Sequence, residues 1–323
     1  MLLLAATIAL AEDRALLFVG NSYTQANNLE QVALALFVAG AECETAATRN
    51  ATPGYTLPQH LADADGSNGD KPLRASLVTG GQTWTWVFLQ DQSQIPGFPQ
   101  NGAEYQASLA SVPLLDGMVA GAGGQTVLLQ TWGRRDGDEL NPDRYPDYPT
   151  MQEHLAEGYA GYAAAITAEG RTGWIAPAGY GFRHVYQTDP EGLFPRLYIE
   201  DGSHPSPLGT YLVACVVYAT VTGDRCSDLT PPDGLSAADA ADLQAAADAA
   251  VFDESPDVLY PWSGGDPGED CAGTGAGDTA APADDSQDPG TAACGCAADG
   301  KSASILGGLL ALAIGRRREG SCD

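Results

Sequence analysis

Lysine is nearly absent from this chain of 323 residues, in which only Lys71 and Lys301 occur. Lysine and arginine together number 15, against 42 aspartate and glutamate residues, so the formal net charge is -27. Proteins that bind DNA or RNA neutralise phosphates with clustered basic side chains. The composition therefore excludes nucleic acid as a partner and predicts a well-solvated, acidic surface.

The sequence also lacks the cysteine and histidine spacing of a structural zinc site. It has no C-x-x-C pair and no histidine at zinc spacing from a cysteine, so we expect neither a metal nor another cofactor. Cys215 lies in an apolar helical stretch, which favours a buried free thiol. In an exported protein a bridge to Cys226 is the alternative. The seven cysteines are Cys43, Cys215, Cys226, Cys271, Cys294, Cys296 and Cys322.

No apolar run approaches the roughly 20 residues that a membrane-spanning helix needs. Residues 263–300 contain no basic or aromatic residue and are rich in Gly, Ala, Asp and Pro, which predicts a disordered acidic linker. Residues 301–323 combine a short apolar run with three arginines. Together with Cys294-Gly295-Cys296, this end resembles the C-terminal sorting tail of myxobacterial surface proteins. The resemblance implies attachment to the membrane or cell surface, and a weakly amphipathic tail is the alternative.

The first eleven residues are apolar and end in Ala9-Leu10-Ala11, a small-residue pattern typical of signal-peptide cleavage. The run lacks the preceding basic residues of a typical signal peptide, so the alternative is that it is simply the segment that leads into the first strand. We expect residues 1–11 to be a signal peptide and the protein to be exported, to the cell surface or the extracellular space.

Residues 12–262 alternate strand-like apolar runs with longer helical patterns, which predicts a parallel sheet with helices on both faces. This segment is expected to form one domain. The expected strands are 15–20, 44–49, 86–89, 126–129 and 173–176, and the expected helices are 29–40, 102–121, 150–169 and 206–222.

Two short strings suggest nucleophilic catalysis. Ser22 follows the first apolar strand, at the strand end where open α/β sheets place their ligands. Asp201 and His204 stand three residues apart just before the last predicted helix. Serine needs a base to become a nucleophile, and the base needs a partner that fixes its tautomer. An N-terminal capping role is the alternative for Asp201, but Ser206 is better placed as the cap.

Donors for a developing oxyanion are expected at three places. The backbone amide of Ser22 is one, and the amide of Gly54 in the loop after the second strand is another. The third is a side-chain amide after the third strand, where Gln90 and Gln92 alternate onto the same face.

Residues near the predicted strand ends are candidates for contact with the substrate. Asn21 adjoins the nucleophile, and Trp132 and Arg134 follow the fourth strand. Tryptophans near strand ends, Trp84 and Trp86 included, stack on sugar rings in some sites, with packing in the core as the alternative. Arginine suits an anionic group on a substrate, with a solvated surface position as the alternative.

Four of these blocks resemble the SGNH hydrolases, also called the GDSL esterase/lipase superfamily: Gly20-Asn21-Ser22, Gly54, Gln90–Gln92 and Asp201 with His204. The resemblance spans residues 14 to 225. It implies a five-stranded parallel sheet in a flavodoxin-like three-layer sandwich, with Ser22 as nucleophile, Gly54 as oxyanion donor, His204 as base and Asp201 as its partner. The chain departs from the family at Asn21, where the family name has Asp, and at Gln92, in place of an asparagine.

The combined prediction is an exported serine esterase that removes small acyl groups, such as acetyl, from a small-molecule or glycan ester. A lipase or thioesterase acting on longer acyl chains is the first alternative. A catalytically silent carbohydrate-binding protein on the same scaffold is the second, because the third block has changed.

Overall fold

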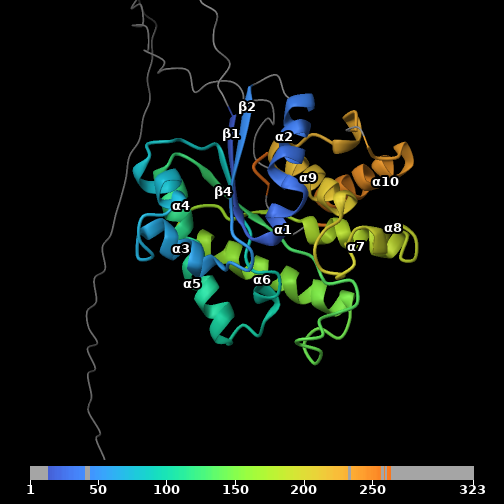
Figure 1. Cartoon of the computed structure of the whole chain (residues 1–323), viewed down its shortest axis with the longest axis horizontal. Helices are drawn as coiled ribbons and strands as arrows, with labels where there is room; N and C mark the ends of the chain where they lie inside the picture. The colour runs from blue at the N-terminus through green and yellow to red at the C-terminus, as the bar shows by residue number, and fades with distance from the viewer. Residues whose placement is uncertain (1–13, 41–43, 232–233, 256–257, 259, 263–323) are drawn as a thin grey trace, which may run out of the picture. The chain divides into compact units, whose positions relative to one another are not determined.

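Five parallel strands form one sheet in the order β2-β1-β3-β4-β5 (Figure 1). This is the flavodoxin-like order, in which chain direction across the sheet reverses between β1 and β3. The predicted α/β fold and its parallel sheet are therefore confirmed. The strands are β1 (Arg14–Gly20), β2 (Thr45–Ala51), β3 (Trp86–Leu89), β4 (Gln125–Leu129) and β5 (Trp174–Ala176).

The structure is a computed structural model that describes residues 14–40, 44–231, 234–255, 258 and 260–262. These residues belong to one unit of the chain, Met1–Gly275. The predicted signal peptide 1–11, linker 263–300 and tail 301–323 lie outside the described residues, as do Cys43 and the four cysteines of the tail.

Successive strand residues are buried on opposite faces of the sheet. In β1, Leu16 and Phe18 pack into one core, and Leu17 and Val19 pack into the other. Burial on both faces explains why the strands read as continuous apolar runs. The first core is covered by α2 (Leu29–Gly40), α7 (Ala178–Thr188), α9 (Pro207–Thr222) and α10 (Ala237–Asp248), and the second by α3 (Leu57–Asp65), α5 (Ala103–Gly121) and α6 (Tyr148–Ala168).

Short helical elements occupy several loops around the sheet. One of them, α1, follows β1 directly and therefore fixes the first residues after the strand. These elements are α1 (Ser22–Gln25), η1 (Ala26–Asn28), α4 (Pro72–Arg74), η2 (Ala75–Thr79), η3 (Ile95–Gly97), α8 (Leu193–Arg196), η4 (Cys226–Asp228) and η5 (Ala249–Asp253).

The helices α3, α7 and α10 were not predicted from the sequence. The start of α3 has a local signal, because Thr56 and Gln59 form a capping box. Helix α7 has no comparable signal, since Gly179 and Gly181 lower its intrinsic helix propensity. It forms through tertiary packing: a Cβ on Gly181 would lie 3.2 Å from Leu212 of α9.

Cys215 and Cys226 are joined by a disulfide, so the expectation of a free thiol at Cys215 is wrong. Helix α9 ends at Thr222, and the φ of 76° at the following residue, Gly223, turns the chain back beside the helix. This reversal brings the two Cα atoms to 5.4 Å, within the usual range for a bridge.

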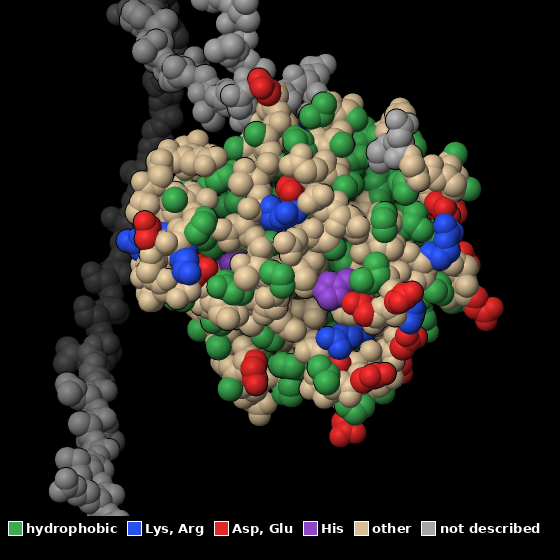
Figure 2. All heavy atoms as spheres, in the orientation of Figure 1, with side chains coloured by type: hydrophobic (Ala, Val, Ile, Leu, Met, Phe, Trp, Pro, Cys, Tyr) green, Lys and Arg blue, Asp and Glu red, His purple; other side chains and the backbone are tan. Residues whose placement is uncertain are grey.

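Charged side chains are spread over the face seen in Figure 2, where basic groups stand singly among acidic ones. No helix in the described part of the chain is both long and apolar enough to cross a membrane.

Acid should weaken the packing of α3 against β1 through His60. This buried ring lies 2.9 Å from the Gly20 carbonyl oxygen, and burial lowers its pKa to about 4. Between pH 6.5, the ordinary pKa of histidine, and about pH 4, His60 is protonated in the unfolded chain but neutral in the folded chain. The free energy of unfolding therefore falls as pH falls. We expect this residue to contribute a loss of about 2.5 kcal/mol between pH 7.5 and 4.5.

The measurement is urea unfolding at both pH values for the natural chain and for His60→Gln. Glutamine can still donate to the Gly20 carbonyl but does not titrate. An equal pH dependence in the two proteins would contradict the prediction.

Candidate active site

The candidate site lies at the carboxyl ends of β1, β2 and β3, beside the point where chain direction across the sheet reverses. Ser22 follows β1, Gly54 follows β2 and Gln92 follows β3, while His204 arrives from the loop before α9. Open α/β sheets bind ligands at this position because the loops on either side diverge and leave a crevice. These residues, with five neighbours, line a hollow of about 110 Å³.

A chain of two short hydrogen bonds links Ser22, His204 and Asp201. The Ser22 hydroxyl oxygen lies 2.8 Å from His204 Nε2, and His204 Nδ1 lies 2.6 Å from Asp201 Oδ2. A carboxylate can only accept, so Nδ1 carries the proton and Nε2 is free to accept from the serine hydroxyl. The three predicted residues are therefore brought together in the geometry that a nucleophile, a base and an orienting acid require.

The loop that holds Asp201 keeps its side chain ionised. Partial burial raises the pKa of Asp201, but hydrogen bonds from the backbone of Ser203 and from the His204 ring and backbone hold it below its usual value. Gly202 has a φ of 63°, which closes the loop between the carboxylate and the imidazole. Ser206 caps α9, so the aspartate remains available to the histidine.

Asn21 fixes the turn that carries Ser22 and offers no free polar atom to a substrate. Its side chain accepts a hydrogen bond from the Tyr23 amide and donates to the carbonyl oxygens of Tyr55 and Asp91, at 3.0 and 3.2 Å. With 2% of its surface exposed, it joins the loops after β1, β2 and β3. Asn21 lines the hollow, as expected, but all of its polar atoms are engaged within the protein, so its hydrogen bonds are structural.

Gln90 lies under the same turn and is not placed to contact an oxyanion. Its Oε1 accepts from the Asn21 amide at 3.0 Å and from the Thr24 hydroxyl at 2.8 Å, and its Nε2 donates to the Asp91 carbonyl. The residue is 1% exposed, so the expectation that it is an oxyanion donor is wrong. A Cβ at Gly20 would meet both Thr24 and Gln90, which explains the glycine before the turn.

Three other donors border the hollow. No hydrogen bond to a described residue occupies the backbone N–H of Ser22 or of Gly54, and Gly54 has a φ of 74° that suits glycine. Gln92 accepts from the Gln94 amide through its Oε1 at 2.8 Å, which fixes the side chain and leaves its Nε2 uncommitted among the described residues. These groups lie where the sequence predicted them.

Trp132 packs against the loop that carries Ser203 and His204. Its ring stacks between Tyr23 and Phe182, and its Nε1 donates to the Ser203 carbonyl oxygen at 3.2 Å. It is 2% exposed, so its expected contact with substrate is wrong. Tyr23 completes the support, with its hydroxyl 2.6 Å from Ser203 Oγ and its ring edge-on to His204.

The remaining candidates divide between surface and core. Arg134 lines the hollow, as expected, but its guanidinium is paired with Asp138, which is buried. Trp84 and Trp86 are buried in the two hydrophobic cores and cannot stack on a sugar. The edge aromatics therefore give no support for a carbohydrate at this hollow.

Asp91 was missed by sequence reasoning, although it stands between two residues that were named. Its Oδ1 accepts from the amides of Leu57 and Gln92, and its Oδ2 accepts from the Tyr162 hydroxyl at 2.8 Å. Burial raises the pKa of this carboxyl despite these hydrogen bonds. The residue holds the start of α3 and the Gln92 segment together, and only the pairing of distant loops could have revealed this.

Groups of three or more His, Cys, Asp or Glu side chains placed to hold a metal ion do not occur among the described residues. Of the histidines other than His204, His60 is buried, His184 lies 2.6 Å from Glu254, and His154 faces Glu157.

The chain is similar to a protein from Slackia heliotrinireducens described as a candidate SGNH hydrolase, with 27% identity and a TM-score of 0.50 over 65% of this chain and 99% of that one. It is also similar to a DUF4886 family protein from Bacteroides uniformis ATCC 8492, with 17% identity and a TM-score of 0.63 over 77% and 98% of the two chains. The second likeness shows the fold alone. No family model and no curated protein matches the sequence.

Replacing Gln90 with methionine should destabilise the protein by about 2–4 kcal/mol, because the buried Asn21 amide and Thr24 hydroxyl would lose their acceptor. Urea unfolding measures the change. The control is Gln106→Met on the exposed face of α5, for which we expect a change within about 0.5 kcal/mol. A Gln90 variant as stable as this control would contradict the assigned role.

Proposed function

We propose that the protein is a serine hydrolase that cleaves short-chain acyl esters through Ser22, His204 and Asp201. The observation that carries the proposal is the continuous hydrogen-bonded chain from the serine hydroxyl through the imidazole to an ionised carboxylate. The fold and the likeness to a candidate SGNH hydrolase support ester hydrolysis at the coarser level.

In the first half of the reaction, Ser22 Oγ attacks the ester carbonyl carbon while His204 Nε2 takes the hydroxyl proton. Asp201 stabilises the imidazolium that forms. The negative charge that develops on the carbonyl oxygen faces the Ser22 and Gly54 amides and the Gln92 side-chain amide. Collapse of this intermediate breaks the ester C–O bond, and the alcohol leaves with the proton from His204.

In the second half, the acyl group is joined to Ser22 and a water molecule attacks its carbonyl carbon. His204 takes a proton from that water and returns it to Ser22 Oγ as the bond to the acyl group breaks. The products are the free acid and the regenerated enzyme. No redox step or additional co-reactant is needed, because one water molecule supplies the hydroxyl group of the acid and the hydrogen that the alcohol gains.

The size of the hollow favours a small acyl group. A volume of about 110 Å³ accommodates an acetyl-type group but not an extended chain of eight carbons. This favours the short-chain esterase over a lipase or thioesterase. The aligned triad argues against a catalytically silent binding protein, the other alternative.

The Cys215–Cys226 disulfide supports the proposal that the protein works outside the cytoplasm, because disulfides persist in oxidising compartments. Cell-surface attachment through the tail stays a prediction from the sequence.

Ser22→Ala should lower kcat on p-nitrophenyl acetate by about 10⁴-fold or more, since the nucleophile is lost while binding groups remain. The natural chain should also prefer acetate over octanoate esters in kcat/KM by more than about tenfold, because a longer acyl chain exceeds the volume of the hollow.

As a control for folding, the Ser22→Ala protein should unfold at the same temperature as the natural chain. Equal turnover by the two folded proteins would refute the mechanism, and a preference for octanoate would refute the acyl-size assignment.

Gln92→Ala should lower kcat by about 10²-fold with little change in KM, since an oxyanion donor acts mainly in the transition state. Gln100→Ala, a change of an exposed glutamine in the next loop, provides the control. Steady-state kinetics on p-nitrophenyl acetate measure both variants. If Gln92→Ala retains the turnover of the control, the oxyanion role of this side chain is wrong.

A further inference from the structure

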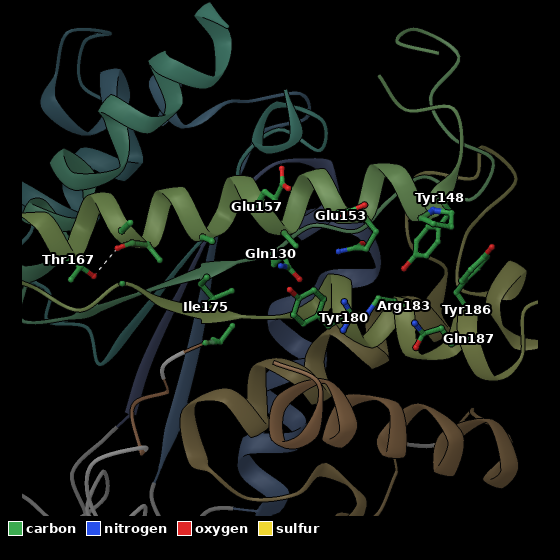
Figure 3. A pocket seen from close by; sticks show the side chains of 18 residues that line it. Gln130, Tyr148, Glu153, Glu157, Thr167, Ile175, Tyr180, Arg183, Tyr186 and Gln187 are labelled. Carbon is green, nitrogen blue, oxygen red and sulfur yellow. Dashed lines mark hydrogen bonds between the residues drawn. The ribbon is translucent and has the colours of Figure 1, made fainter. Parts of the chain in front are cut away.

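A second and larger pocket, between α6 and α7, is separate from the proposed triad (Figure 3). It has a volume of about 690 Å³, and Gln130 and Gln152 are among the residues that line it. None of its residues belongs to the Ser22 hollow or to the segments that carry Ser22 and His204. The contacts that set the distance between these two side chains therefore lie where the two segments meet.

Two consecutive asparagines with left-handed backbone follow the short helix that begins at Ser22. Asn27 has a φ of 51° and Asn28 a φ of 55°. In the described part of the chain, they are the only residues other than glycine with a positive φ. A residue with a Cβ adopts this conformation at a cost that surrounding contacts must offset, although asparagine tolerates it better than most residues. The turn is therefore held by contacts, and those of Asn27 reach the segment that carries His204.

The Asn27 side-chain amide spans the gap between the two segments. Its Nδ2 donates to the Pro205 carbonyl oxygen at 3.0 Å and to the Thr210 hydroxyl at 2.9 Å. Asn27 itself is exposed, but both acceptors belong to buried residues. Proline fixes its own φ and restricts the residue before it, so a hydrogen bond to the Pro205 carbonyl also restrains the backbone of His204.

His204 is thereby tied to the Ser22 segment on both sides. On one side, the hydroxyl oxygens of Ser203 and Tyr23 lie 2.6 Å apart, and on the other side Asn27 holds the residue that follows the histidine. Between these ties, His204 Nε2 lies 2.8 Å from Ser22 Oγ. Proton transfer from the serine to the imidazole depends on this distance, and a small misplacement slows it strongly.

We propose that Asn27 is a positioning residue for the esterase reaction, because it fixes the His204 segment against the turn that carries Ser22. The inference rests on the proposed function, since it concerns the same triad. Asn28 offers a matched control: it has the same backbone conformation, but its Oδ1 accepts from Arg49 of β2 at 3.2 Å. No hydrogen bond within the described residues joins Asn28 to the histidine segment.

The experiment places glycine and aspartate at each of the two positions in the full chain. Glycine adopts a φ near 51° without strain, so Asn27→Gly removes the amide and keeps the turn. Aspartate also tolerates the turn, but its carboxylate can only accept and cannot donate to the Pro205 carbonyl.

Both Asn27 variants should lower kcat on p-nitrophenyl acetate about tenfold or more, with KM changed less than about twofold. The reason is that the lost hydrogen bond acts on the approach of base to nucleophile and not on substrate binding. Asn28→Gly and Asn28→Asp should keep kcat within about twofold of the natural chain.

A fluorophosphonate probe measures the same step without ester turnover. It reacts with a serine whose hydroxyl proton is taken by a base, so labelling of Ser22 should slow in the Asn27 variants by the same factor as kcat. Unfolding temperatures show which variants are folded. If Asn27→Gly does not fold, Asn27→Asp is judged by the same criteria.

The positioning role is overturned if a folded Asn27 variant keeps the kcat and labelling rate of the natural chain, if the loss appears in KM alone, or if Asn28→Gly loses as much as Asn27→Gly. The proposed function is tested separately, on the natural chain. Absence of both ester hydrolysis and Ser22 labelling there would refute the esterase and this role together. An active natural chain with unchanged Asn27 variants would refute the positioning role alone.

Discussion

The candidate active site depends on one buried amide. Gln90, at the end of β3, accepts hydrogen bonds from both Asn21 and Thr24 of the turn after β1. Since α1 begins at Ser22, the position of the serine hydroxyl is set by this tie between two neighbouring strands. A carbonyl oxygen buried between strands is hard to replace, because water cannot reach the groups it leaves behind. The turn is therefore held in place by the cost of leaving these buried groups without a hydrogen bond. Ser22, which follows in the same turn, is held in place with it.

His204 is held by a second set of contacts, which joins the two ends of the domain. Tyr23 and Trp132 pack under the loop that carries His204, and Ser203 bonds to both. The imidazole therefore meets Ser22 across a separation of 182 residues without a flexible link on either side. Preorganisation of this kind is what the proposed triad requires in order to act without rearrangement when charge develops.

The two pockets are close to one structural element, the segment that follows β4. Gln130 and Gln152 line the larger pocket, and Gln152 also accepts a hydrogen bond from the Gly133 amide, next to Arg134 at the Ser22 hollow. The tryptophans that suggested a carbohydrate in the sequence are buried, so they do not support sugar contact at the Ser22 hollow.

The sequence by itself determined the strands and the parallel sheet, because continuous apolar runs express them, and two short local motifs were enough to single out Ser22, Asp201 and His204 as the candidate triad. Tertiary structure alone decided that Gln90 and Trp132 are buried supports, that Cys215 is bridged and that α7 is a helix despite its glycines. It also decided the pocket between α6 and α7, whose residues come from separate elements and share no motif. Whether a side chain is buried, or a cysteine is bridged, depends on which distant segments of the chain come into contact. Local sequence patterns do not specify those contacts.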